Sequence, residues 1–186
     1  MPLQHFSRFL SVDDARIYLL LTEPGTGVGA ATYGTGIDAP GIRKISWKPG
    51  FDSKELRGDN TVLDTDVIPG SGEGELEYAK THLDWLAILF GGTVSDTGST
   101  PNQIATFSYT GGQLPKYWKI EAQCKTADLA DVHVVIYKCK ITDGPQGEMM
   151  DSDYGVQNLK FKFVQPRSTD PEYKLLFNET PTAITG

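Results

Sequence analysis

The alternation of apolar and polar positions predicts a chain built mainly of β-strands. In residues 116–126, Trp118, Ile120, Ala122 and Cys124 lie on one side, and charged or amide side chains lie on the other. This period of two is the signature of a half-buried strand. Residues 132–142 alternate in the same way and predict one shared face made of Val135, Tyr137, Cys139 and Ile141. Since a short turn separates the two segments, we expect an antiparallel hairpin.

Further strands are expected along the rest of the chain. In the last of them Leu159, Phe161 and Phe163 alternate with Lys160 and Lys162. The segments with strand character, recognised by alternation or by β-branched and aromatic residues, are 15–22, 42–48, 75–79, 105–109, 116–126, 132–142 and 156–164.

A single helix is predicted at about 81–90. Thr81 is a suitable N-cap, and Asp84 three residues later completes a pair resembling a capping box. Gly91 is placed to take the left-handed conformation that ends a helix. One apolar face is expected from Leu83, Leu86, Ala87 and Phe90, with Trp85, Ile88 and Leu89 covering much of the remainder. The helix is therefore expected to be buried on more than one side.

The remaining segments are rich in residues that break regular structure. The 186 residues include 20 glycines and 11 prolines, more than the usual share of about 12%. We expect long loops at 23–41 and 49–74, a single domain over 1–165, and a polar C-terminal arm at 166–186. The fold class that follows is mainly β: an antiparallel β-sandwich or barrel flanked by one α-helix.

The charge balance argues against a protein that grips nucleic acid. The chain has 17 basic and 24 acidic residues, a formal net charge of −7, whereas phosphate binding requires a basic patch. The only basic cluster is spread over several predicted strands, and we interpret it as the solvated or subunit-facing side of a sheet. Its members are Lys116, Lys119, Lys125, Lys138, Lys140, Lys160 and Lys162.

No arrangement of residues predicts catalysis, a cofactor or a metal site. The glycine-rich segment 25–30 lacks both the spacing and the following helix of a dinucleotide fingerprint. No serine lies in a G-x-S-x-G elbow, and His5, His82 and His133 have no evident partner at a recognisable spacing. We therefore expect a protein that is not an enzyme, with no catalytic, cofactor-binding or metal-binding residues.

Other short features are interpreted as structural. Two carboxylate pairs, Asp13 with Asp14 and Asp64 with Asp66, are taken as solvated loop charges. Residues 57–59 spell the cell-adhesion tripeptide Arg-Gly-Asp, and residues 178–180 form an N-glycosylation sequon. Both would matter only in an extracellular protein. Cys124 and Cys139 fall inside predicted strands, which favours reduced thiols packed in the core. We see no apolar run of about 20 residues and no signal peptide, which predicts a protein made and kept in a cytoplasm or built into a particle there.

The order of elements across residues 76–163 has a distinctive pattern. A strand leads into a helix ending in LAILFGGTV; LPKYWKIEAQCK then opens a hairpin that returns through VHVVIYKCKI, and a turn with Asp-Tyr-Gly precedes NLKFKF. This pattern resembles the major tail proteins, or tail-tube proteins, of siphovirus-type bacteriophages and gene-transfer particles. The segments that carry it are Gly74–Val94, Leu114–Lys125 and Val132–Val164, roughly half of the chain.

The resemblance implies a structural subunit. Six copies would close into a ring, and rings would stack into a tube through which DNA passes to the host cell. Partners would be the chain itself, with tape-measure, tail-terminator and distal tail proteins, and DNA in transit without specific binding. The place would be the virion tail, assembled in the bacterial host cytoplasm. On this hypothesis an acidic lumen repels phosphate, and segments 23–41, 49–74 and 166–186 reach across subunit or ring boundaries.

Two alternatives remain open. One is another component with the same fold, such as a tail terminator, a distal tail protein or a type VI secretion tube subunit. The other is a carbohydrate-binding β-sandwich module, for which Trp47, Trp118 and several tyrosines could supply a binding platform. Against it, Trp118 lies on the apolar face of its strand and Trp85 on the helix, positions where core packing is the ordinary outcome.

Overall fold

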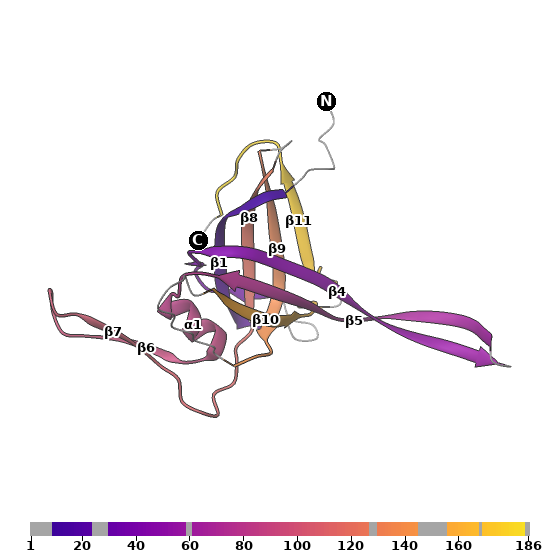
Figure 1. Cartoon of the computed structure of the whole chain (residues 1–186), viewed down its shortest axis with the longest axis horizontal. Helices are drawn as coiled ribbons and strands as arrows, with labels where there is room; N and C mark the ends of the chain where they lie inside the picture. The colour runs from indigo at the N-terminus through magenta and orange to yellow at the C-terminus, as the bar shows by residue number, and fades with distance from the viewer. Residues whose placement is uncertain are drawn as a thin grey trace.

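The protein was analysed as a computed structural model, which describes residues 9–23, 30–58, 61–126, 130–144, 156–167 and 169–184. One α-helix and eleven strands appear in this part of the chain, and the strands pair antiparallel (Figure 1). The mainly β fold with one helix is confirmed. The elements in order are β1 Phe9–Thr22, β2 Thr32–Tyr33, β3 Ile37–Asp38, β4 Ile42–Gly58, β5 Thr61–Tyr78, α1 Leu83–Phe90, β6 Thr93–Thr97, β7 Ile104–Ser108, β8 Trp118–Thr126, β9 Asp131–Ile141, β10 Gln157–Phe163 and β11 Tyr173–Asn178.

The main sheet runs in the order β2-β1-β8-β9-β10-β5-β4, with β3 paired to β1 and β11 paired to β9. It curls so that β4 approaches β1, and the two strands line a common hollow between Val12 and Trp47. A second, two-stranded sheet is formed by β6 and β7. The body is therefore a half-closed barrel, and two hairpins, β4–β5 and β6–β7, project from it to opposite sides (Figure 1).

Large aromatic side chains fill the inside of the curled sheet. The rings of Trp118 and Phe161 meet edge to face with centroids 5.2 Å apart, and Phe163 lies beyond Phe161. Phe161 is paired in register with Gly74 on β5. A methyl group at Gly74 would clash with the Phe161 ring, so the glycine makes room for the aromatic side chain that packs over it.

Strands β8 and β10 follow the alternation read from the sequence. Trp118, Ile120 and Ala122 on β8 are buried, and Leu159, Phe161 and Phe163 on β10 are buried, while Lys160 and Lys162 are exposed. The antiparallel β8–β9 hairpin is also confirmed, with Cys124 opposite Val132. These segments were predictable because one side of each faces the core and the other does not.

The predicted face of β9 is correct for Cys139 and Ile141 and wrong for Val135 and Tyr137. The core receives Val134 and Ile136 and then, after a break in the alternation, Cys139 and Ile141. Trp118 pairs with Cys139 while Ile120 pairs with Ile136, so Tyr137 and Lys138 together oppose one residue of β8. Lys138 has a φ of 38°. This is a β-bulge, which shifts the pattern by one residue and turns the strand.

The helix begins later than predicted, and its most buried side differs in part from the predicted face. The expected burial on more than one side is confirmed, because Leu83, Leu86 and Ala87 are half-buried as well. The N-cap of the helix is His82, in extended conformation and without a side-chain capping bond; the Thr81 cap is therefore wrong. The buried side chains are Trp85, Ile88, Leu89 and Phe90. The edge of the Trp85 ring meets Tyr78 with centroids 4.8 Å apart. The C-terminal end is confirmed: Gly91 has a φ of 80°, and its N–H bonds to the carbonyl of Ala87.

The loop predicted at 49–74 is wrong. These residues continue β4 and β5 in one long antiparallel pair that runs from Ile42 opposite Tyr78 to Gly58 opposite Thr61. The sequence predicted a loop here because Asp and Gly, which are frequent in this segment, have a low β propensity. We call residues 50–58 and 61–70 of this pair the distal arm.

Two further segments are more ordered than the sequence indicated. In the predicted loop 23–41, β2 and β3 both pair with β1; the glycine-rich residues 25–29 lie outside the described residues. The expected C-terminal arm 166–186 contains β11, which pairs with β9 from Tyr173 opposite Ile136 to Asn178 opposite Asp131. Ile184 is buried, with 3% of its surface exposed. The segment is thus part of the body.

Within the described residues, no helix has both the length and the apolar character needed to cross a lipid bilayer.

Candidate functional site

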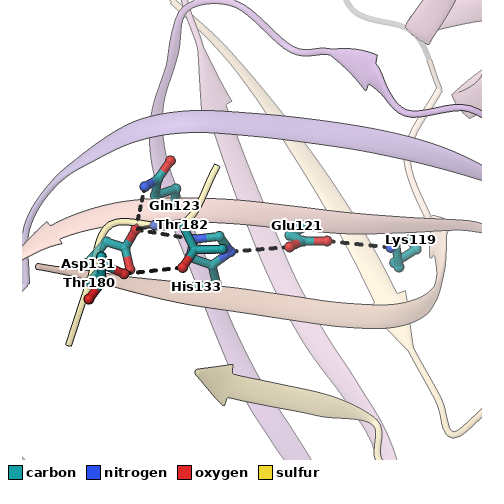
Figure 2. Close-up of polar contacts among 7 residues, drawn as sticks. All are labelled: Lys119, Glu121, Gln123, Asp131, His133, Thr180 and Thr182. Carbon is teal, nitrogen blue, oxygen red and sulfur yellow. Dashed lines mark hydrogen bonds and ion pairs between the residues drawn. The ribbon is translucent and has the colours of Figure 1, made fainter. Parts of the chain in front are cut away.

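A row of polar side chains crosses the β8–β9 hairpin (Figure 2). On β8 these side chains alternate with the buried Trp118 and Ile120, so the row lies on the side opposite to the aromatic core. Lys119, Glu121 and Gln123 come from β8, and Asp131 and His133 come from β9. Alternate residues of a strand share a face, so the antiparallel register brings the two sets together, with Gln123 opposite His133.

The distances define a connected network. Gln123 Nε2 donates to Asp131 Oδ2 at 2.6 Å, and His133 Nε2 lies 3.5 Å from the same oxygen. His133 Nδ1 lies 3.2 Å from Glu121 Oε1, and Lys119 Nζ lies 3.5 Å from Glu121 Oε2. Asp131 and His133 are only 2% and 3% exposed, so neither offers a surface that a substrate could reach.

The network also holds the C-terminal segment. The backbone N–H of Thr182 donates to Asp131 Oδ2 at 2.8 Å. Although burial alone would raise it, the pKa of Asp131 is lowered by hydrogen bonds from Thr182, Asn178 and Gln123 and by the charge of His133. A buried carboxylate with these donors fixes the chain after β11 onto the sheet, which is a structural role.

Lys119 continues the row toward β1 and β2. Its Nζ lies 3.8 Å from the centroid of the Tyr18 ring and 5.2 Å from that of Tyr33. Burial lowers the pKa of Lys119, and the neighbouring Glu121 opposes this effect. Burial is the main reason that the pKa of Tyr18 is raised to about 12, and the nearby charge of Glu121 adds to the increase. These shifts follow from packing between strands.

A second candidate region is the distal arm, which leaves the body as a two-stranded ribbon (Figure 1). Its side chains include large apolar groups: Phe51, Leu56 and Val67 are 69%, 63% and 56% exposed. Charged residues lie between them, among them Asp64 and Asp66, and Lys54 is paired in register with Asp66. A ribbon of this composition is suited to contact another molecule, since exposed apolar groups mark interaction surfaces.

The outward side of β4, β5 and β10 forms a third region, which we call the ladder face. Its residues are Lys44, Ser46, Lys48, Glu73, Glu75, Glu77, Asn158, Lys160 and Lys162. The central strand carries only glutamates at these positions, and lysines lie on the strands to either side. Lys44 Nζ is 3.3 Å from Glu75 Oε2, and Lys162 Nζ is 3.6 Å from Glu73 Oε1. Part of this face borders a shallow pocket beside Trp47 and Thr142.

The residues singled out in the sequence are mostly kept apart. Asp13 pairs with Lys125 at 2.8 Å, and His82 lies at the start of α1, 3.7 Å from Asp84. Arg57 pairs with Glu55 at 2.7 Å. His5 and Asp59 lie outside the described residues.

The His133 network was missed because His133 was considered alone. The signal was present: Glu121 and Gln123 precede the turn, and Asp131 and His133 follow it, at alternating positions that an antiparallel hairpin must place side by side.

The two cysteines are free thiols on neighbouring strands. Cys139 is fully buried in the core, and burial raises the pKa of its thiol well above the usual value; the prediction of a core-packed residue is confirmed for it. Cys124 is partly buried beside the hollow between β1 and β4. In the part of the chain that the structure describes, no group of His, Cys, Asp and Glu residues is arranged to hold a metal ion.

No protein-family model matches the chain, and a search of curated proteins gives no significant match.

Proposed function

We propose that this chain is the structural subunit of a phage-type tail tube, six copies forming a ring and rings stacking around a channel through which DNA passes to the host cell. The proposal places it in the virion tail, assembled in the bacterial host cytoplasm. Its other partners are tape-measure, tail-terminator and distal tail proteins. It is proposed as a structural protein and not an enzyme.

The observation that carries the proposal is the distal arm. Two strands alone form a marginal structure in water, because they bury too little apolar surface. Yet here the pair continues to Gly58 and Thr61, well beyond the body, and exposes Phe51, Leu56 and Val67. Contact with another copy of the chain would cover these side chains and hold the ribbon in place.

The edges of the main sheet support a ring. Strand β4 is the last strand at one edge of the main sheet. At the opposite edge, β2 and β3 both pair with β1. An unpaired edge strand is a template for pairing with another chain. A head-to-tail contact that closes on itself uses both of these edges.

Negative-stain electron microscopy of the purified full chain tests the proposal. Rings, or tubes with a central channel, are the expected result. A monomer that persists at high concentration would overturn it. The variant Phe51→Ser with Val67→Ser is expected to form fewer tubes. A conservative change at an exposed polar position of the same arm, Thr65→Ser, is the control and should leave tube formation unchanged.

The same micrographs separate the related tube-fold components. Single rings that never stack would fit a terminator or distal tail role, whereas long tubes support the major tube subunit. The carbohydrate-binding alternative is weakened by burial: Trp85 and Trp118 are 1% and 0% exposed, and Trp47 is partly buried, with its ring centroid 6.4 Å from that of Tyr173.

A further inference from the structure

The ladder face is a polar part of the body surface, in contrast to the distal arm with its exposed apolar side chains. Resting on the tube function proposed above, we infer that this face lines the channel of the assembly and lets duplex DNA slide along it without being held.

One side of β4, β5 and β10 is covered by the rest of the subunit, and this determines which side of these strands can face the channel. The covered side, opposite to the ladder face, carries Leu76, Phe161 and Phe163. When neighbouring copies join through sheet edges, the sheets form a continuous closed wall. The bulk of each subunit then lies on one side of that wall, and only the outer side of a ring has room for it. The ladder face is left toward the channel.

The composition of the face agrees with a surface that stays in water after assembly. The large apolar side chains exposed among the described residues lie elsewhere: on the distal arm, on the β6–β7 hairpin, at the end of β1, on β11 and in connecting segments. They are Leu21, Phe51, Leu56, Val67, Ile68, Ile104, Tyr109, Leu114, Leu175 and Leu176. Surfaces of that kind are covered in interfaces. A face of lysines, glutamates, Ser46 and Asn158 is suited to remain solvated.

The charges on the face are arranged in cross-strand rows. One row joins Lys48, Glu73 and Lys162, with Lys140 of β9 beyond Lys162. The next row joins Ser46, Glu75 and Lys160. Each glutamate on β5 therefore has a lysine beside it or diagonal to it. Such pairs are exposed and individually weak, but they lower the charge that a passing phosphate meets.

This arrangement changes the expectation of an acidic lumen. The net charge of −7 belongs to the whole chain, whereas the ladder face carries lysines and glutamates together. Affinity for duplex DNA rises with the number of phosphates that cations neutralise. Glutamates interleaved with lysines keep that number small, so DNA is neither strongly repelled nor retained.

A labelling experiment locates the face. Ser46→Cys on the ladder face and Ser95→Cys on β6 are each assembled into tubes from the full chain and labelled with a maleimide gold cluster, with the unmodified protein as control for Cys124. Electron microscopy is expected to show gold inside the channel for Ser46→Cys and elsewhere for Ser95→Cys. Gold from Ser46→Cys on the outer wall would overturn the inference while leaving the tube intact. A chain that forms no tube would overturn both proposals.

A binding experiment tests the charge compensation. The triple variant Glu73→Gln, Glu75→Gln, Glu77→Gln removes the carboxylates and keeps the side-chain shapes. A matched triple, Asp38→Asn, Asp96→Asn, Glu179→Gln, removes the same charge from exposed positions off the face. Fluorescence anisotropy measures the binding of a short labelled DNA duplex to each assembled protein.

We expect the ladder variant to bind the duplex at least about tenfold more tightly than the unmodified protein at about 50 mM salt, and to lose this gain near 200 mM. The matched control should bind like the unmodified protein. Equal tightening by both variants would show an effect of net charge alone and would overturn the assignment, as would no tightening by either. If the triple variant fails to assemble, the gold label decides the question.

Discussion

The two halves of the β4–β5 pair behave as different structures although they belong to the same two strands, which meet at an irregularity in the pairing between Lys48 and Gly50. In the half next to the body, Leu76 and Tyr78 are 0% and 3% exposed and contribute to the aromatic core. In the distal arm, Phe51 and Leu56 are 69% and 63% exposed. Antiparallel pairing of the same two strands therefore supports folding in one half and presents a surface in the other. The difference indicates that substitutions in the body act on stability, and substitutions in the arm act on assembly.

The largest loss of stability is expected from the aromatic core. Phe161→Ala removes a ring that is 1% exposed and leaves a cavity beside Trp118 and Gly74, at a cost of about 3–5 kcal/mol. Urea unfolding followed by tryptophan fluorescence measures it. A loss below about 1 kcal/mol would show that the body is not organised around this ring.

A smaller loss is expected at the buried carboxylate of the network. Asp131→Asn replaces an acceptor of bonds from Gln123 and Thr182 with a group that can only partly satisfy them, costing about 1–3 kcal/mol. The C-terminal segment should become more accessible to proteases. Unchanged proteolysis would contradict its role as an anchor.

The same residue gives the stability a pH dependence. The pKa of Asp131 is lowered in the folded protein, so the unfolded chain takes up a proton at higher pH than the folded one. Its contribution is present above the ordinary aspartate pKa of about 3.9 and is lost as pH falls through the folded value. Unfolding measured from pH 7 to pH 3 should show a shallower acid loss in Asp131→Asn than in the unmodified protein.

A loss of about 1 kcal/mol is expected at the end of the helix. Gly91 has a φ of 80°, and an added Cβ would lie 3.0 Å from the Leu114 carbonyl oxygen. Gly91→Ala therefore strains the backbone that ends α1. Thermal unfolding monitored by circular dichroism measures it, and Gly111→Ala, where a Cβ meets open space, is the control.

The smallest change in stability is expected in the arm. Phe51→Ser with Val67→Ser should alter the free energy of unfolding of the unassembled subunit by no more than about 0.5 kcal/mol, because both side chains are exposed. The fraction of protein sedimenting as assemblies should nevertheless fall severalfold. A variant that unfolds easily and assembles normally would reverse the distinction between body and arm.

The sequence was a good guide for strands in which the burial of one side continues without a break. The alternation on β8 and β10 and the glycine after α1 were correct because burial and backbone conformation act there residue by residue. The distal arm was read as a loop, since its strands have no buried face to produce alternation. The bulge at Tyr137 and Lys138 and the association of His133 with Asp131 depend on register between strands, which one strand's pattern does not specify.

Strand β9 pairs with three other strands, β8, β10 and β11, and this affects the order in which the chain folds. Strand β8 reaches β9 through a short connection, with Cys124 opposite Val132, whereas β11 must return from a distant part of the chain to place Tyr173 opposite Ile136. Closing the longer loop costs more entropy, so we expect the β11 contact to form late. Until then one half of β9 has an open edge, and newly made subunits at high concentration are exposed to mispairing at that strand before they reach the assembly pathway.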